Sequence, residues 1–162
     1  IQRVWDALDS AEQQVPEVAF EAAERLLAHG GAVAVSRQWL LPIWDAMVQR
    51  HDALTLPQRV RLARVLERGF AAPEGAPDAA WLSRIEAAQM GNPRDAVLQY
   101  LAGVVCMRLS LWGKSQQLFK QSLAVLADSD LARDTWLALA QMAEQRQDMA
   151  SAAQAYREAA KR

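Results

Sequence analysis

Apolar residues along this chain recur three and four positions apart, which is the spacing of one face of an α-helix. Apolar and polar residues do not alternate with a period of two over any useful length, although such alternation is typical of a half-buried strand. Proline, glycine and short polar runs divide the helical pattern into segments. The pattern therefore predicts an all-α protein. The expected helices are Gln2–Leu8, Pro16–Gly30, 32–50 (kinked or interrupted by Pro42), Pro57 to Phe70, 79–90, 94–109, 112–126, 131–146 and 149–161, with a brief turn at Ser10.

Short polar residues precede or open several of these segments. A side-chain oxygen at such a position can accept a hydrogen bond from the free N–H groups of the first helical turn. The residues expected to cap helices in this way are Ser10, Asp78, Ser110, Ser129 and Asp148.

The last two helix pairs repeat each other at a constant offset of 37 residues, the separation of Gly103 and Ala140. Small residues fall on small ones, and the aromatic Phe119 falls on Tyr156. Where two helices of a hairpin cross closely, a small residue on one leaves room for a large side chain from the other. We therefore expect Phe119 and Tyr156 to insert into holes made by small residues. The small positions are Gly103, Ser115 and Ser122 in one pair and Ala140, Ala152 and Ala159 in the next.

This pattern resembles the tetratricopeptide repeat. The residues of the last pair that match its order and spacing are Trp136, Leu139, Ala140, Ala152, Tyr156 and Ala159. The preceding pair matches less fully, because Gln99 stands where the early aromatic residue belongs. The resemblance implies antiparallel helix hairpins stacked as a right-handed superhelix. It implies a single helical-repeat domain over 1–162, made of a degenerate pair with a leading short helix (1–55), a divergent pair (56–91) and two repeats (92–128 and 129–162).

Longer stretches resemble the C-terminal region of proteobacterial HemY proteins. The most specific are "LWGKSQQL" (111–118) and "LAQMAEQ" (139–145), and "LLPIWDAM" (40–47) and "AAWLSRIEAAQ" (79–89) agree with them. The resemblance implies a protein of the bacterial inner membrane that is associated with haem biosynthesis. The membrane helices of that family lie N-terminal to its repeats, so we expect this part to be a soluble domain on the cytoplasmic side. An unrelated flavin oxidase shares the name, but the chain lacks the G-x-G-x-x-G fingerprint that such an enzyme needs.

Composition narrows the classes of function. Apolar residues make up 52% and charged residues 23%, as in a globular protein, and the net charge of −1 gives no overall field for nucleic acid. No apolar run is long enough for a membrane span. The chain begins at Ile1 without Met, so we expect it to be a segment of a longer protein with targeting or membrane segments upstream.

Candidate chemistry is sparse. Neither His29 nor His51 has a second ligand at metal-binding spacing, and Cys106, the only cysteine, lies in the apolar run "GVVCM". No nucleophile has a base at a recognisable spacing. We therefore expect no catalysis, no metal site and no cofactor, with haem ligation by Cys106 as the remote exception.

Arginine and tryptophan provide the other candidates. Arg61, Arg64 and Arg68 follow one stripe of a helix, which is either a solvated face or a basic strip for an acidic partner or a porphyrin propionate. The phases of Trp39, Trp81 and Trp136 predict core positions. Trp44 and Trp112 are candidates for exposed anchors.

In the tetratricopeptide family the first helix of each pair lines a concave surface that holds peptides. Carried onto this chain, the resemblance predicts a partner-binding groove lined by Tyr100, Val104, Met107 and Arg108 in one repeat and by Leu137, Ala138, Gln141 and Glu144 in the next. The Lys/Asn set with which some members hold a terminal carboxylate is absent from these positions.

Three functions remain open. The first is a non-enzymatic protein–protein interaction scaffold whose partners are other proteins, by resemblance the enzymes of haem biosynthesis. The second is a module that binds or carries haem or porphyrin directly. The third is a regulator of the turnover of a porphyrin enzyme.

Overall fold

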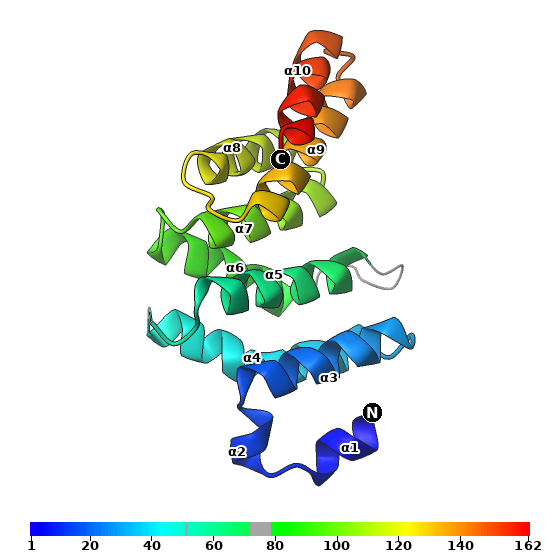
Figure 1. The fold of residues 1–162 in the computed structure, drawn as a ribbon, viewed down its shortest axis with the longest axis vertical. Coiled ribbons are helices and arrows are strands. Elements are labelled where there is room, and N and C mark those ends of the chain that lie inside the picture. The colour runs from blue at the N-terminus through cyan, green and yellow to red at the C-terminus, as the bar shows by residue number, and fades with distance from the viewer. Residues whose placement is uncertain (51, 72–78) are drawn as a thin grey trace. The chain divides into compact units, whose positions relative to one another are not determined.

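The computed structural model describes residues 1–50, 52–71 and 79–162. Within that part of the chain it contains ten α-helices and no strand, with 80% of the residues helical. The all-α prediction is therefore confirmed (Figure 1). The chain forms two compact units, Ile1–Asp78 and Ala79–Arg162. Their boundary falls inside the predicted 56–91 helix pair, and the right-handed superhelix stays a prediction.

The first unit is built around three long helices, α3, α4 and α5, which pack against one another. Trp5 and Trp39 stack with their ring centroids 4.7 Å apart, and this contact docks α1 onto α4. Pro42 lies inside α4 without ending it, so the predicted interruption does not occur. The helices are α1 (Gln2–Ala7), α2 (Ser10–Gln13), α3 (Pro16–Ala28), α4 (Val33–Gln49) and α5 (Leu56–Ala71).

The second unit consists of α6 (Ala79–Gly91), α7 (Ala96–Arg108), α8 (Trp112–Leu123), α9 (Ser129–Gln145) and α10 (Met149–Ala160). Helices α7 and α8 form one hairpin and α9 and α10 form another (Figure 1). Helix α6 packs against α7, and α8 packs against α9. Among the described helices, none combines the length and the apolar character that crossing a bilayer requires.

At two helix starts the cap is an aspartate and not the serine that follows it. Asp9 caps α2, where its Oδ1 accepts from the backbone N–H of Glu12 at 2.7 Å, so Ser10 is the first helical residue. Asp128 caps α9 through the N–H of Leu131 in place of the predicted Ser129. The prediction for Asp148 is confirmed, since it accepts from Ser151. Asp78 lies outside the described residues.

The crossing of α7 and α8 has the predicted small-and-large register. Phe119 is fully buried and packs so closely on Gly103 that a Cβ there would lie 2.7 Å from the ring. The buried hydroxyl of Ser115 donates to the carbonyl of Gly103 at 2.7 Å. A small residue on each helix therefore allows the two backbones to approach.

The equivalent crossing of α9 and α10 follows the register only in part. The alanines predicted to be small positions, Ala140, Ala152 and Ala159, are buried. Tyr156, however, is 38% exposed, so it does not fill a hole as Phe119 does. The side chain of Glu144 raises the pKa of Tyr156.

The same backbone turn links α3 to α4, α7 to α8 and α9 to α10. Gly30, Ser110 and Gln147 each have φ between 59° and 73°, in the left-handed region. In each turn the next N–H bonds to a carbonyl five residues back, as from Leu111 to Cys106 at 2.8 Å and from Asp148 to Ala143 at 2.9 Å. This pattern is the Schellman helix end. Ser110 and Gln147 stand 37 positions apart, so the sequence repeat is also a repeat of backbone conformation. Ser110 therefore ends α7 and does not cap α8.

Candidate functional site

The predicted partner-binding groove is only partly open. Arg108, Gln141 and Glu144 are exposed, and Met107, Leu137 and Ala138 are half-buried. Tyr100 and Val104 are buried, with 2% and 1% of their surface exposed. The prediction that these two residues line an open surface is therefore wrong.

Tyr100 and Val104 are buried because helix α7, which carries them, is enclosed over most of its length. Ten consecutive residues, Val97–Cys106, are buried, so α7 has no solvent face before Met107. Even Gln99 is enclosed, and its amide donates to the carbonyl of Pro93 at 2.6 Å. A helix that is apolar on every side is a core helix, and α7 is one.

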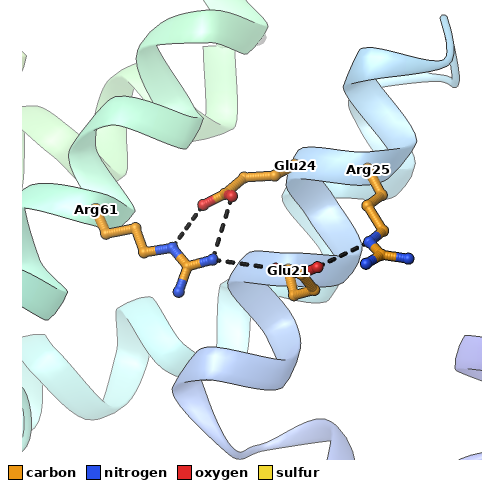
Figure 2. A network of polar contacts seen from close by, with 4 residues as sticks. All are labelled: Glu21, Glu24, Arg25 and Arg61. Atoms are coloured by element: carbon orange, nitrogen blue, oxygen red, sulfur yellow. Dashed lines mark hydrogen bonds and ion pairs between the residues drawn. The ribbon is translucent and has the colours of Figure 1, made fainter.

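The arginine stripe on α5 is largely engaged inside the first unit. Arg61 donates two hydrogen bonds to Glu24 of α3, at 2.6 Å from Nε and 3.2 Å from Nη2, and its Nη2 lies 3.5 Å from Glu21. Figure 2 shows the three side chains facing one another. Its guanidinium also lies over the ring of Phe20, with 5.4 Å to the centroid. The hydrogen bond with Glu24 raises the pKa of Arg61. Arg61 therefore ties α5 to α3.

The other two arginines of the stripe differ from Arg61. Arg64 pairs with Glu67 of its own helix at 3.2 Å. Arg68 is exposed. Two of the three predicted cations thus have acidic partners within the unit.

Of the candidate metal and haem ligands that the structure describes, His29 belongs to the first unit and Cys106 to the second. His29 follows the last residue of α3, and His51 lies outside the described residues. Cys106 is buried, and burial raises the pKa of its thiol. In the described ranges no group of three or more His, Cys, Asp or Glu residues is placed to hold a metal ion.

The tryptophans divide into buried residues, the half-buried Trp136 and the exposed Trp112. Trp39 and Trp81 are buried as predicted, and Trp44 is buried as well. Trp136 is half-buried. Trp112, the other candidate for an anchor, is 41% exposed at the start of α8.

Trp112 belongs to a group of exposed apolar side chains at the link between α7 and α8. Leu109 and Leu111 are 43% and 48% exposed, and the three residues together are called the apolar turn below. The matching residues of the other two turns are His29, Gly30, Gly31 and Ala32, and Arg146, Gln147, Asp148 and Met149. Position 112 is matched by Met149, which is 59% exposed, so an exposed apolar residue there is not specific to this turn. The positions that match Leu109 and Leu111 carry His or Arg and Gly or Asp. Because all three turns share one backbone geometry, that geometry does not require the two leucines.

A pocket of about 120 Å³ opens beside the apolar turn, between α6, α7 and α8. The side chains that give it an apolar wall include Ile85, Ala102, Val105, Cys106, Leu111 and Leu118. Glu86 and Lys114 also line the pocket, and they pair with each other at 3.1 Å. This ion pair raises the pKa of Lys114. Such a wall can hold an apolar group.

Comparisons with protein-family models, with curated proteins and with solved structures give no match to this chain. The site therefore has to be interpreted from its own geometry. The sequence contains a signal for it, since "LSLW" (109–112) differs from "RQDM" (146–149) at the same repeat register.

Proposed function

We propose that this chain is a non-enzymatic scaffold, a helical domain that binds other proteins. The observation that supports this most directly is the apolar turn of Leu109, Leu111 and Trp112. Adjacent exposed apolar side chains that form one patch mark sites of association, whereas single exposed apolar residues do not. Tryptophan is among the residues that contribute most to the binding energy of interfaces.

The resemblance to HemY proteins supplies the expected partners and place. In this proposal the partners are enzymes of haem biosynthesis. The full-length protein is held at the bacterial inner membrane by segments outside this chain, and this domain lies on the cytoplasmic side. The sequence motifs alone support this part of the proposal.

The apolar pocket argues against the alternative that the domain carries haem or porphyrin there. Sites for small molecules commonly measure about 300–1,000 Å³, whereas this pocket measures about 120 Å³. A haem titration followed by absorbance tests the alternative directly. A saturable spectral shift that disappears when His29, His51 and Cys106 are replaced together would favour the carrier.

Site-specific photo-crosslinking in the full-length protein tests the scaffold proposal. A photoreactive amino acid is placed at Leu109, and the matched control carries it at the exposed Arg146, which has the same place in the next turn. We expect crosslinks to other proteins from position 109 and few from position 146. Equal crosslinking from both positions, or none from position 109, would contradict a binding role for the apolar turn.

A further inference from the structure

We infer that the pocket between α6, α7 and α8 receives one apolar side chain from an acidic segment of a partner protein. This inference rests on the proposed function and specifies the chemistry of the partner.

The size of the pocket fixes the size of the group that enters it. An apolar cavity of about 150 Å³ holds one benzene molecule, and this pocket measures about 120 Å³. One leucine-, methionine- or phenylalanine-sized group is the largest occupant that fits without rearrangement. The wall residues Ala102, Val105 and Leu118 are apolar, so a charged group would lose its hydration there without compensation.

The surroundings of the pocket indicate that this group belongs to a larger molecule. Leu109 and Leu111 line the pocket and remain more than two-fifths exposed, and Trp112 follows them. A free molecule of benzene size inside the pocket leaves this apolar surface in water. A polypeptide that inserts one side chain can cover the turn with its neighbouring residues.

The charges near the pocket indicate an acidic partner. Helices α7 and α8 and the link between them (96–123) carry three basic residues and no Asp or Glu, although the whole chain has a net charge of −1. Of the three, Lys114 lines the pocket and Lys120 does not. Arg108 is exposed and directly precedes the apolar turn. Glu86, the acidic residue that lines the pocket, is already paired with Lys114. Electrostatic complementarity therefore favours a segment with Asp or Glu on either side of the apolar residue.

Synthetic peptides test the inference on the whole chain. The probe is a fluorescent peptide of Asp, Glu and Ser with one central Leu, and binding is followed by anisotropy at low and high salt. Two control peptides replace the Leu by Ser or every acidic residue by Lys. We expect the acidic Leu peptide to bind about tenfold or more tightly than the Ser peptide, because its Leu is removed from water. Its binding should weaken as salt is raised.

Variants of the protein locate the binding. Ala102→Leu fills the pocket, so it should remove the preference for the Leu peptide over the Ser peptide. Arg108→Glu should weaken the acidic peptide several-fold, whereas Arg146→Glu, which changes an exposed arginine at another turn, should leave its affinity unchanged. Circular dichroism checks that each variant is folded.

The wild-type thiol gives a measurement that does not depend on any variant. Cys106 is the only cysteine and lies in the pocket wall, so its alkylation is counted by intact mass. The bound Leu peptide should slow that alkylation several-fold, and the Ser peptide should not.

Four results would overturn the inference. The first is equal binding of the acidic and basic peptides, and the second is binding that does not need the Leu. The third is strong binding of anionic lipid vesicles that depends on Trp112 while the peptide fails, which would assign the turn to a bilayer surface. The fourth is self-association through the turn, seen by sedimentation, which would assign the turn to a second copy of the chain.

The two proposals can fail separately. If photo-crosslinking from position 109 succeeds while the peptide does not bind, the inference of an acidic partner segment is wrong and the scaffold proposal stands.

Discussion

Gly103 of α7 and Phe119 of α8 are in direct contact, and the aromatic ring occupies the space where any other residue at 103 would place its Cβ. The distance from such a Cβ to the ring atoms Cδ1 and Cε1 would be 2.7 Å. Phe119 is fully buried, so its ring has no solvent space into which to move. The hairpin crossing therefore depends on the absence of a side chain at Gly103.

Gly103→Ala should destabilise the second unit. We expect a loss of about 1–3 kcal/mol, as for other overpacked core sites, in spite of the higher helix propensity of alanine. Thermal or urea unfolding measures the change. The control is Gly113→Ala in α8, where a Cβ would meet nothing within 4 Å, and it should be neutral or stabilising by up to about 1 kcal/mol. A neutral Gly103→Ala would show that α7 and α8 separate easily.

At the three turn residues with positive φ, glycine should be more stable than any residue with a side chain. Ser110→Gly and Gln147→Gly should each stabilise the protein by less than about 1 kcal/mol, because only glycine adopts positive φ without steric cost. Gly30→Ala should cost about 1 kcal/mol. Melting temperatures of the three variants test this, and destabilisation by both glycine substitutions would contradict the shared turn geometry.

Arg61 and Glu24 should couple energetically in a double-mutant cycle. The two hydrogen bonds from the guanidinium of Arg61 to the carboxylate of Glu24 join α5 to α3 and are partly buried (Figure 2). We therefore expect a coupling energy of about 1 kcal/mol. Arg61→Lys should lose most of it, because an ammonium group cannot make the paired hydrogen bonds. The control is Arg25→Gln, which removes a more exposed pair with Glu21 and should cost about 0.5 kcal/mol or less. A coupling near zero would return Arg61 to the set of residues available to a ligand.

The alkylation of Cys106 should have a shifted pH profile. Burial raises the pKa of the thiol; Lys114 lowers it and Glu86 raises it, both to a smaller extent. Because the thiolate is the reactive form, the alkylation rate of the native protein should rise at higher pH than that of the urea-unfolded chain. In the native state the Cys106 thiol loses its proton at a higher pH than in the unfolded state. The thiol therefore makes the free energy of unfolding fall as the pH rises above its pKa in the unfolded state. Coincident profiles would show that the thiol is exposed to solvent.

Much of the fold was predictable because helix periodicity is a local property. The segments expected at 79–90 and 149–161 lie close to the observed Ala79–Gly91 and Met149–Ala160. Caps were harder to assign where two polar residues are adjacent, as at Asp128 and Ser129, because both can accept the same hydrogen bonds. The register of small residues also held in α7 and α8, where Gly103 and Ser115 are both required by the crossing.

The candidate site was less predictable because burial depends on contacts between segments distant in the sequence. Tyr100 was assigned to an open face by its position in a repeat, whereas the helix that carries it is enclosed. The acidic partners of Arg61 lie about 40 residues away on α3, so no inspection of α5 alone reveals them. The apolar turn could have been found by aligning "LSLW" with "RQDM", but the pocket beside it requires the placement of α6.

The enclosure of α7 has a consequence for the order in which the second unit opens. The backbone amides of Gln99–Cys106 lie in helical hydrogen bonds, and those of Val97 and Leu98 donate to Asp95 Oδ1, all under buried side chains. In α10, by contrast, more than half of the residues are exposed. In native-state hydrogen exchange, amides that open only on complete unfolding exchange slowest. The α7 amides should therefore report the global stability of this unit, while those of α10 exchange through local fraying at lower free energy. Mass spectrometry of peptides from the two helices would separate these two kinds of opening, and a partner bound at the apolar turn would slow exchange at the C-terminal end of α7 first.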